Sequence, residues 1–131
     1  MSKTNSYRQV ELLILSYLPS ALWAGLIFFL SDQQLLPGLG LSAWDFIAKK
    51  LAHMFVYAVL YYLLFWAYRR THQQSPLSNK NYWWPLAIAL IYAASDEIHQ
   101  SFVSGRTATL RDFAYDALGM ITVLLHQQNL L

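Results

Sequence analysis

The feature that most constrains the fold is a long apolar run near the start of the chain. It covers residues 10–30, close to the roughly 20 residues that a helix needs to cross the hydrocarbon core of a bilayer. Further apolar runs, counted with their polar ends, follow at 47–69, 82–100 and 110–127. Lipid cannot hydrogen-bond to free backbone groups, so such runs cross a membrane as helices. We predict an all-α integral membrane bundle of about four transmembrane helices, preceded by a leader at residues 1–9.

Composition also favours lipid as the solvent. Apolar residues make up 56% of the chain and charged residues 12%, whereas a soluble domain carries roughly a quarter charged residues. A soluble helical bundle is the alternative for the whole chain, and a signal peptide is the alternative for the first run. The net charge of +2 and the basic residues at segment ends do not form a nucleic-acid-binding stripe. The absence of cysteine excludes disulfides and thiolate metal sites. By length, residues 10–131 form one transmembrane domain.

Basic residues near the predicted spans indicate orientation. The leader carries Lys3 and Arg8, and the loop between the second and third spans carries Arg69, Arg70 and Lys80. With four spans these groups share a side, so we predict a multi-pass protein of the inner (cytoplasmic) membrane with both termini in the cytoplasm. The opposite side carries nearly as many basic residues, namely Lys49, Lys50, Arg106 and Arg111. The predicted orientation therefore holds only if carboxylates of a site pair with those four cations, so that they count for less in the comparison of the two sides.

Most acidic groups of the chain lie between Ser95 and Asp116, beside apolar runs. Charges at the edge of lipid indicate a functional site by default. At 100° per residue, one narrow stripe of the second run carries Lys50, His53, Tyr57 and Tyr61. A similar stripe of the fourth run carries Asp112, Tyr115, Asp116 and Gly119. Asp112 and Asp116 lie one turn apart, so in a dry site they do not both stay ionised unless a cation joins them.

The third run offers two rival sites. Asp96 and His99 lie on one face of the predicted helix, whereas Glu97 and Gln100 lie on another. Both pairs can face one core only if the helix ends at these residues. Structural roles are also available to nearby residues. The sequence from Thr109 to Asp112 fits a helix capping box, with Thr109 as the cap. Gly119 is suited to close packing between helices.

The sequence contains no strong metal or nucleophile motif. Histidine with carboxylates suits zinc or manganese, but closely spaced ligands of the His-Glu-x-x-His kind are absent. The weak metal candidates are His53, Asp96 and His99, with Asp112 and Asp116. We therefore expect no resident metal and no other cofactor. Glu97 and His53 are candidates for acid–base catalysis, which only geometry can test.

Two strings of residues resemble the VanZ-like family. They are Lys50-x-x-His53-x-x-x-Tyr57 and Asp96-Glu97-x-x-Gln100-x-Phe102-Val103-x-Gly105-Arg106, the latter followed by Asp112 and Gly119. The Ser31-Asp32-Gln33 stretch fits as well, so the resemblance covers about residues 31–119. The chain departs from the family at Ser104, where Pro is usual, and at Asp116, where Asn is usual. The added charge of Asp116 changes what the site binds or calls for a matching cation.

The resemblance implies a small polytopic envelope membrane protein, similar in layout to a family member associated with resistance to the glycopeptide teicoplanin. It favours Glu97 and Gln100 over Asp96 and His99. The binding residues that we predict from it, with Tyr57 added as an aromatic residue along the path of a lipid tail, are Lys50, His53, Tyr57, Glu97, Gln100, Arg106, Asp112 and Asp116.

The expected function is an outward-facing polar pocket that binds or shields a lipid or lipid-linked amphiphile. Lys50 and Arg106 would contact the head, and the carboxylates would hold those cations or bind hydroxyl groups of the head. The alternative is a membrane enzyme that modifies a lipid or lipid-linked cell-wall precursor by acid–base chemistry on the same residues. No nucleic-acid partner is expected, and nothing in the sequence specifies an oligomeric state.

Overall fold

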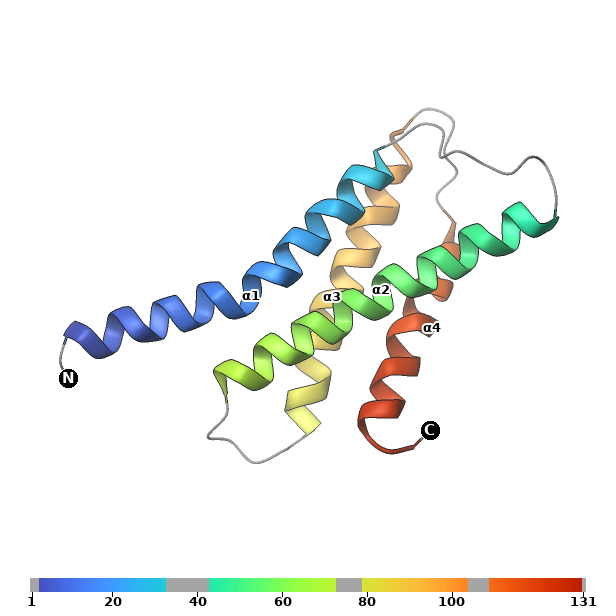
Figure 1. Cartoon of the computed structure of the whole chain (residues 1–131). Helices are drawn as coiled ribbons and strands as arrows, with labels where there is room; N and C mark the ends of the chain where they lie inside the picture. Colours follow the sequence, from blue (N-terminus) through green and yellow to red (C-terminus); the bar gives the residue numbers. More distant parts are fainter. Residues whose placement is uncertain (1–2, 33–42, 73–78, 104–108, 131) are drawn as a thin grey trace.

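Helices make up nearly all of the chain that the structure describes. The computed structural model describes residues 3–32, 43–72, 79–103 and 109–130. These ranges contain no strand and form four helices, α1 (Lys3–Ser31), α2 (Ala43–Thr71), α3 (Asn79–Gln100) and α4 (Leu110–Gln127) (Figure 1). The predicted all-α class is confirmed for these residues. The helices alternate in direction, so the ends of α1 and α3 and the starts of α2 and α4 lie toward the same end of the bundle (Figure 1).

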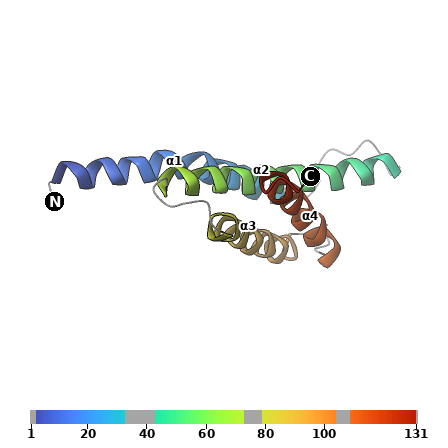
Figure 2. The same cartoon turned by 90° about the horizontal axis from the view of Figure 1, so that it is seen from below.

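The helix α2 is the centre of the bundle, because it packs against each of the other three. Viewed from below, α1 and α2 lie in one layer and α3 lies beneath them (Figure 2). The core is made of buried apolar side chains from all four helices, among them Ile27 of α1, Tyr57, Leu60 and Tyr61 of α2, Leu86 and Ala89 of α3, and Met120 and Leu124 of α4. Van der Waals contacts among these side chains favour helix packing within the bundle.

Gly119 lets α2 and α4 approach closely, as predicted. A Cβ atom at this position would lie 2.8 Å from the carbonyl carbon of Met54, which is too close for any side chain. Met54 is the neighbour of His53, and Gly119 is three residues beyond Asp116. The close contact therefore brings the functional candidates of the two helices together.

The start of α4 is capped by Thr109, which confirms the predicted cap. Its Oγ1 accepts a hydrogen bond from the backbone N–H of Asp112 (3.2 Å) and donates one to the Asp112 carboxylate (3.0 Å). In a standard capping box the third helical residue would accept from the cap's own N–H. Here Glu97 of α3 accepts that bond instead, at 3.1 Å. The cap thus ties α3 to α4 at the polar end of the bundle.

Two of the four helices are long and apolar enough to cross a membrane. The spans are Ser6–Ser31 of α1 and Ile47–Thr71 of α2, and only 17% and 28% of their most apolar windows are buried. Within the described residues, α3 and α4 do not meet the same criterion. The last two turns of α3 contain the acidic pair at 96–97, and α4 is short and carries Arg111, Asp112 and Asp116. Largely exposed apolar helices are consistent with a membrane protein and do not suit the core of a soluble one.

The first helix is an integral part of the bundle. The Trp23 indole N–H donates to the backbone carbonyl of Val56 in α2 at 2.8 Å. The Tyr92 hydroxyl of α3 donates to the carbonyl of Ala24 at 2.6 Å. These contacts fit a membrane helix better than a cleaved signal sequence, which would not need specific partners in α2 and α3.

Candidate functional site

A stripe of polar side chains on α2 meets partners on α3 and α4. Each of its four predicted members makes a polar contact: Lys50 with Asp112, His53 with Asp116, Tyr57 with Asp96, and Tyr61 with Gln127. The helical spacing of these residues therefore identified the side of α2 that faces the other polar groups. Three of the four partners are carboxylates. Asp96 lies one turn before the end of α3, and Asp112 and Asp116 lie in the first two turns of α4.

One group of these residues, which we call the Asp96 network, consists of Ser31, Tyr57, Asp96 and Gln100. All four are buried. The Oδ2 atom of Asp96 accepts hydrogen bonds from the Ser31 hydroxyl at 2.9 Å, the Tyr57 hydroxyl at 2.8 Å and the Gln100 amide at 2.7 Å. The three donors are neutral and come from α1, α2 and α3, so the network joins the ends of α1 and α3 to the middle of α2.

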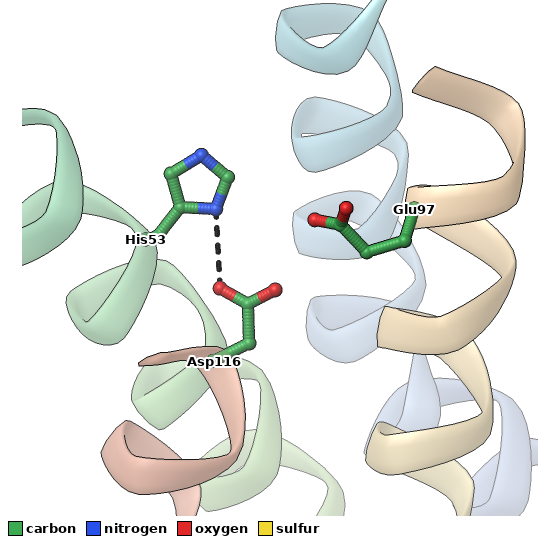
Figure 3. Close-up of side chains that lie close together, drawn as sticks. All are labelled: His53, Glu97 and Asp116. Carbon is green, nitrogen blue, oxygen red and sulfur yellow. Dashed lines mark hydrogen bonds and ion pairs between the residues drawn. The ribbon is translucent and has the colours of Figure 1, made fainter. Parts of the chain in front are cut away.

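A second group, which we call the charged cluster, consists of Lys50, His53, Glu97, Asp112 and Asp116. Figure 3 shows His53 of α2, Glu97 of α3 and Asp116 of α4 pointing toward one another. One donor atom from each of these three residues lies within 4.8 Å of the other two. The His53 Nδ1 and Asp116 Oδ1 atoms are 3.1 Å apart. Asp116 is fully buried, and the His53 side chain is 22% exposed.

The carboxylates of the charged cluster differ in how well they are compensated. Asp112 forms an ion pair with Lys50 and also accepts from Thr109. The Oδ2 atom of Asp116 and the Oε1 atom of Glu97 are buried and have no hydrogen-bond partner among the described residues. A buried carboxylate is ordinarily paired, protonated or bound to a metal. These two oxygen atoms are therefore available to a proton donor or a cation.

The sequence paired Asp96 with His99 and Glu97 with Gln100 on α3, and the structure does not keep these pairs. Asp96, Glu97 and Gln100 are all buried, because α3 ends at Gln100 and is surrounded there by the other helices. His99 instead lies at the edge, with its Nε2 atom 3.5 Å from Asp32 and its ring against Phe28. Asp96 thus joins Gln100 rather than His99. A useful signal for this pairing was Tyr57, which lies on the α2 stripe and reaches Asp96.

The weak metal candidates also separate. Among the described residues, His53 is grouped with Glu97 and Asp116, and neither Asp96 nor His99 belongs to that group. Glu97 was not among the metal candidates from sequence, where it points to a different face of the third run from Asp96 and His99. Arg106 lies outside the described residues, so its predicted place in the site stays a prediction.

The polar residues line a groove and a smaller cavity in the part of the chain that the structure describes. A groove of ≈ 440 Å³ lies between α3 and α4, and Glu97, Ser101 and Thr109 interrupt its otherwise apolar wall. Its apolar lining consists of Ala94, Ile98, Leu110 and Phe113. A smaller cavity of ≈ 80 Å³ between α1, α2 and α3 is lined by both His53 and Asp96. The larger groove combines apolar walls with a carboxylate, as an amphiphile-binding site requires.

Comparison with known proteins identifies the family. The VanZ/LLP1 family model matches residues 3–127, which is nearly the whole chain. The chain therefore belongs to the VanZ/LLP1 family, as its polar motifs predicted. Neither the curated proteins nor the solved structures contain a significant match to this chain.

Proposed function

We propose that this VanZ/LLP1 protein is a multi-pass membrane protein of the cell envelope whose polar end binds or shields a lipid or lipid-linked amphiphile. The observation that carries the proposal is the ≈ 440 Å³ groove between α3 and α4, which has apolar walls and contains Glu97. Glu97 also belongs to the charged cluster. A bound amphiphile would therefore place its tail along the groove and its head against the cluster.

The charged cluster offers the head two kinds of contact. Hydroxyl groups of a head would donate to Glu97 Oε1 and Asp116 Oδ2, which lack partners among the described residues. An anionic group would be attracted to Lys50, which Asp112 holds in place and which lies 5.8 Å from the centre of the Tyr115 ring. The sequence adds Arg106 as a second cation for the head.

We further propose that all four helices cross the membrane with both termini in the cytoplasm, so that the charged cluster faces outward. The alternating directions of the helices support this arrangement (Figure 1). Pairing of Lys50 with Asp112 also lowers the effective positive charge at the cluster end, which favours the opposite end as the cytoplasmic one.

The native chain has no cysteine, so single introduced cysteines report topology cleanly. Ser101 and His72 are exposed. They directly follow α3 and α2, and the ends of these two helices lie at opposite ends of the bundle (Figure 1). In intact cells, a membrane-impermeant maleimide should label Ser101→Cys and should leave His72→Cys unlabelled until the cells are permeabilised. The reverse labelling pattern would contradict the proposed orientation. Labelling of both variants in intact cells would show that α3, the one helix between the two positions, does not cross the membrane.

Ligand binding is tested by mass spectrometry of lipids that co-purify with the full chain. The wild type should retain one enriched class of amphiphile, and Glu97→Gln, which keeps the shape and removes the charge, should retain at least about tenfold less. Asp32→Asn is the matched control, because Asp32 has a 59% exposed side chain and lies outside the charged cluster. The same lipids in the same amounts with wild type and Glu97→Gln would refute this role of Glu97.

Family membership also connects the proposal with glycopeptides. Expression of the wild type should raise the teicoplanin concentration that stops growth of a sensitive host, and an equally expressed Glu97→Gln should not. Equal protection by the two proteins would show that resistance does not depend on the Glu97 carboxylate of the charged cluster.

A membrane enzyme is the second candidate function, and the contact between His53 and Asp116 favours it. A carboxylate 3.1 Å from one imidazole nitrogen orients the ring and stabilises its protonated form, which leaves the other nitrogen for proton transfer. Glu97 would be the second acid–base group. Cells expressing the wild type would then contain a chemically altered lipid or lipid-linked precursor that is absent with Glu97→Gln. Identical profiles would favour binding without turnover.

A further inference from the structure

We infer that His53, Glu97 and Asp116 form a binding site for one divalent metal ion of the zinc or manganese class. The three residues come from α2, α3 and α4, and each offers one donor atom within 4.8 Å of the others (Figure 3). The site does not depend on the amphiphile proposal, since the metal could hold the helix ends together in the absence of any lipid.

The separation of two of the donors already suits a common ion. Zinc binds nitrogen and carboxylate oxygen at about 2.0–2.2 Å, so two neighbouring ligands of one ion lie roughly 3.0–3.5 Å apart. The His53 Nδ1 and Asp116 Oδ1 atoms are 3.1 Å apart. Glu97 reaches toward them from the facing helix and has three side-chain torsions with which to close the remaining distance (Figure 3).

Buried oxygen atoms without partners are the second, independent indication of a ligand. Asp116 is 0% exposed, and its contact with His53 accounts for Oδ1 only. Asp116 Oδ2 and Glu97 Oε1 remain without a hydrogen-bond partner among the described residues. A divalent cation would neutralise both carboxylates at once, whereas a proton on His53 would neutralise only one. The arrangement therefore fits a metal better than a simple histidine–aspartate pair.

The donor set also selects the class of ion. Imidazole suits zinc and related transition metals, whereas carboxylates suit both zinc and manganese. Three protein ligands would leave at least one coordination position open to water or to an oxygen atom of a ligand. The sequence indicated His53 and Asp116 as weak metal candidates but did not indicate Glu97. The three ligands lie on three helices, so no closely spaced motif is present.

The experiment uses the full chain in detergent micelles after removal of metals with EDTA. Zn²⁺ and Mn²⁺ are titrated separately by equilibrium dialysis, and the bound metal is counted by elemental mass spectrometry. The wild type should bind one equivalent per chain. Asp116→Asn and Glu97→Gln should each lower the affinity at least about tenfold, because each removes a charged ligand and keeps the shape of the side chain. Asp32→Asn, the matched control, should bind like the wild type.

A second readout keeps the test decisive if a variant fails to fold. Mn²⁺ bound to the wild type should show hyperfine coupling to the His53 nitrogen by pulsed electron paramagnetic resonance, and the ion should raise the melting temperature of the wild type. Failure of the wild type to bind an equivalent of either ion would overturn the inference. Equal binding by the wild type and a folded Asp116→Asn would overturn it as well, since the metal would then lie elsewhere.

Discussion

The Asp96 network and the charged cluster each contain a buried aspartate, but the two carboxylates have different surroundings. Asp96 Oδ2 accepts hydrogen bonds from three neutral donors. Among the described residues, Asp116 has a single hydrogen-bond partner, the ionisable His53, which contacts Oδ1, and another carboxylate, Glu97, lies opposite (Figure 3). Both aspartates also have one buried oxygen without a partner among the described residues. The difference therefore lies in the number and the charge of the donors.

This difference separates a structural role from a functional one. Three hydrogen bonds from three helices fix the position of Asp96, so its removal should chiefly affect stability. The charged cluster has fewer internal bonds and more negative charge than its described partners compensate, so changes there should chiefly affect binding. Each variant below tests one side of that division, in order of decreasing effect on stability.

Replacing Asp96 with alanine should cause the largest loss of stability. Asp96→Ala leaves the hydroxyls of Ser31 and Tyr57 and the amide of Gln100 without their shared acceptor inside the bundle. At about 1 kcal/mol for each buried donor, the free energy of unfolding should fall by about 3 kcal/mol. Unfolding in detergent micelles, followed by circular dichroism, measures this loss. An unchanged stability would show that the network is not structural.

Replacing Gly119 with alanine should affect the charged cluster more than the Asp96 network. The new Cβ would meet the backbone of Met54, so α2 and α4 must move apart, at a cost of about 2 kcal/mol. Because His53 is next to Met54, the movement should also separate His53 from Asp116. A melting experiment gives the stability, and loss of the bound metal or amphiphile gives the effect on the cluster. Gly25, beside whose Cβ position there is open space, provides the matched Gly→Ala control.

Replacing Tyr57 with phenylalanine should have the smallest effect of the three. Tyr57→Phe removes one of the three donors to Asp96 and keeps the buried ring. The expected loss is about 1 kcal/mol, in keeping with single hydrogen bonds between membrane helices. The same unfolding measurement checks it. A loss as large as that of Asp96→Ala would mean that this one hydrogen bond dominates the network.

The amino-acid sequence predicted the helices and the polar face of α2 well, because both depend on local periodicity. The apolar runs indicated four helices, and the 100° spacing placed Lys50, His53 and Tyr57 on one stripe. The cap at Thr109 was also readable, since it depends on residues only three positions apart. The VanZ/LLP1 family model covers all of these residues, since it matches residues 3–127.

The partners within the site could not be predicted, because they depend on how separate helices pack. Periodicity divided Asp96 from Glu97, but the end of α3 buries both residues. It also gave no indication that Glu97, rather than Asp112, accepts the N–H of Thr109. The grouping of Glu97 with His53 and Asp116 similarly needs three helices in place. Contacts between distant segments are outside the reach of local patterns.

The most direct test of the account is native mass spectrometry of the full chain carrying either of two neighbouring, charge-removing substitutions. Glu97→Gln changes the charged cluster, whereas Asp96→Asn changes the network and keeps an oxygen acceptor for its three donors. The two variants and the wild type are compared at a temperature below the melting temperature of each, so that all three are folded. The account predicts that the amphiphile adduct is lost from Glu97→Gln and retained by Asp96→Asn. Retention by Glu97→Gln together with loss from Asp96→Asn would contradict it and move the site to the Asp96 network.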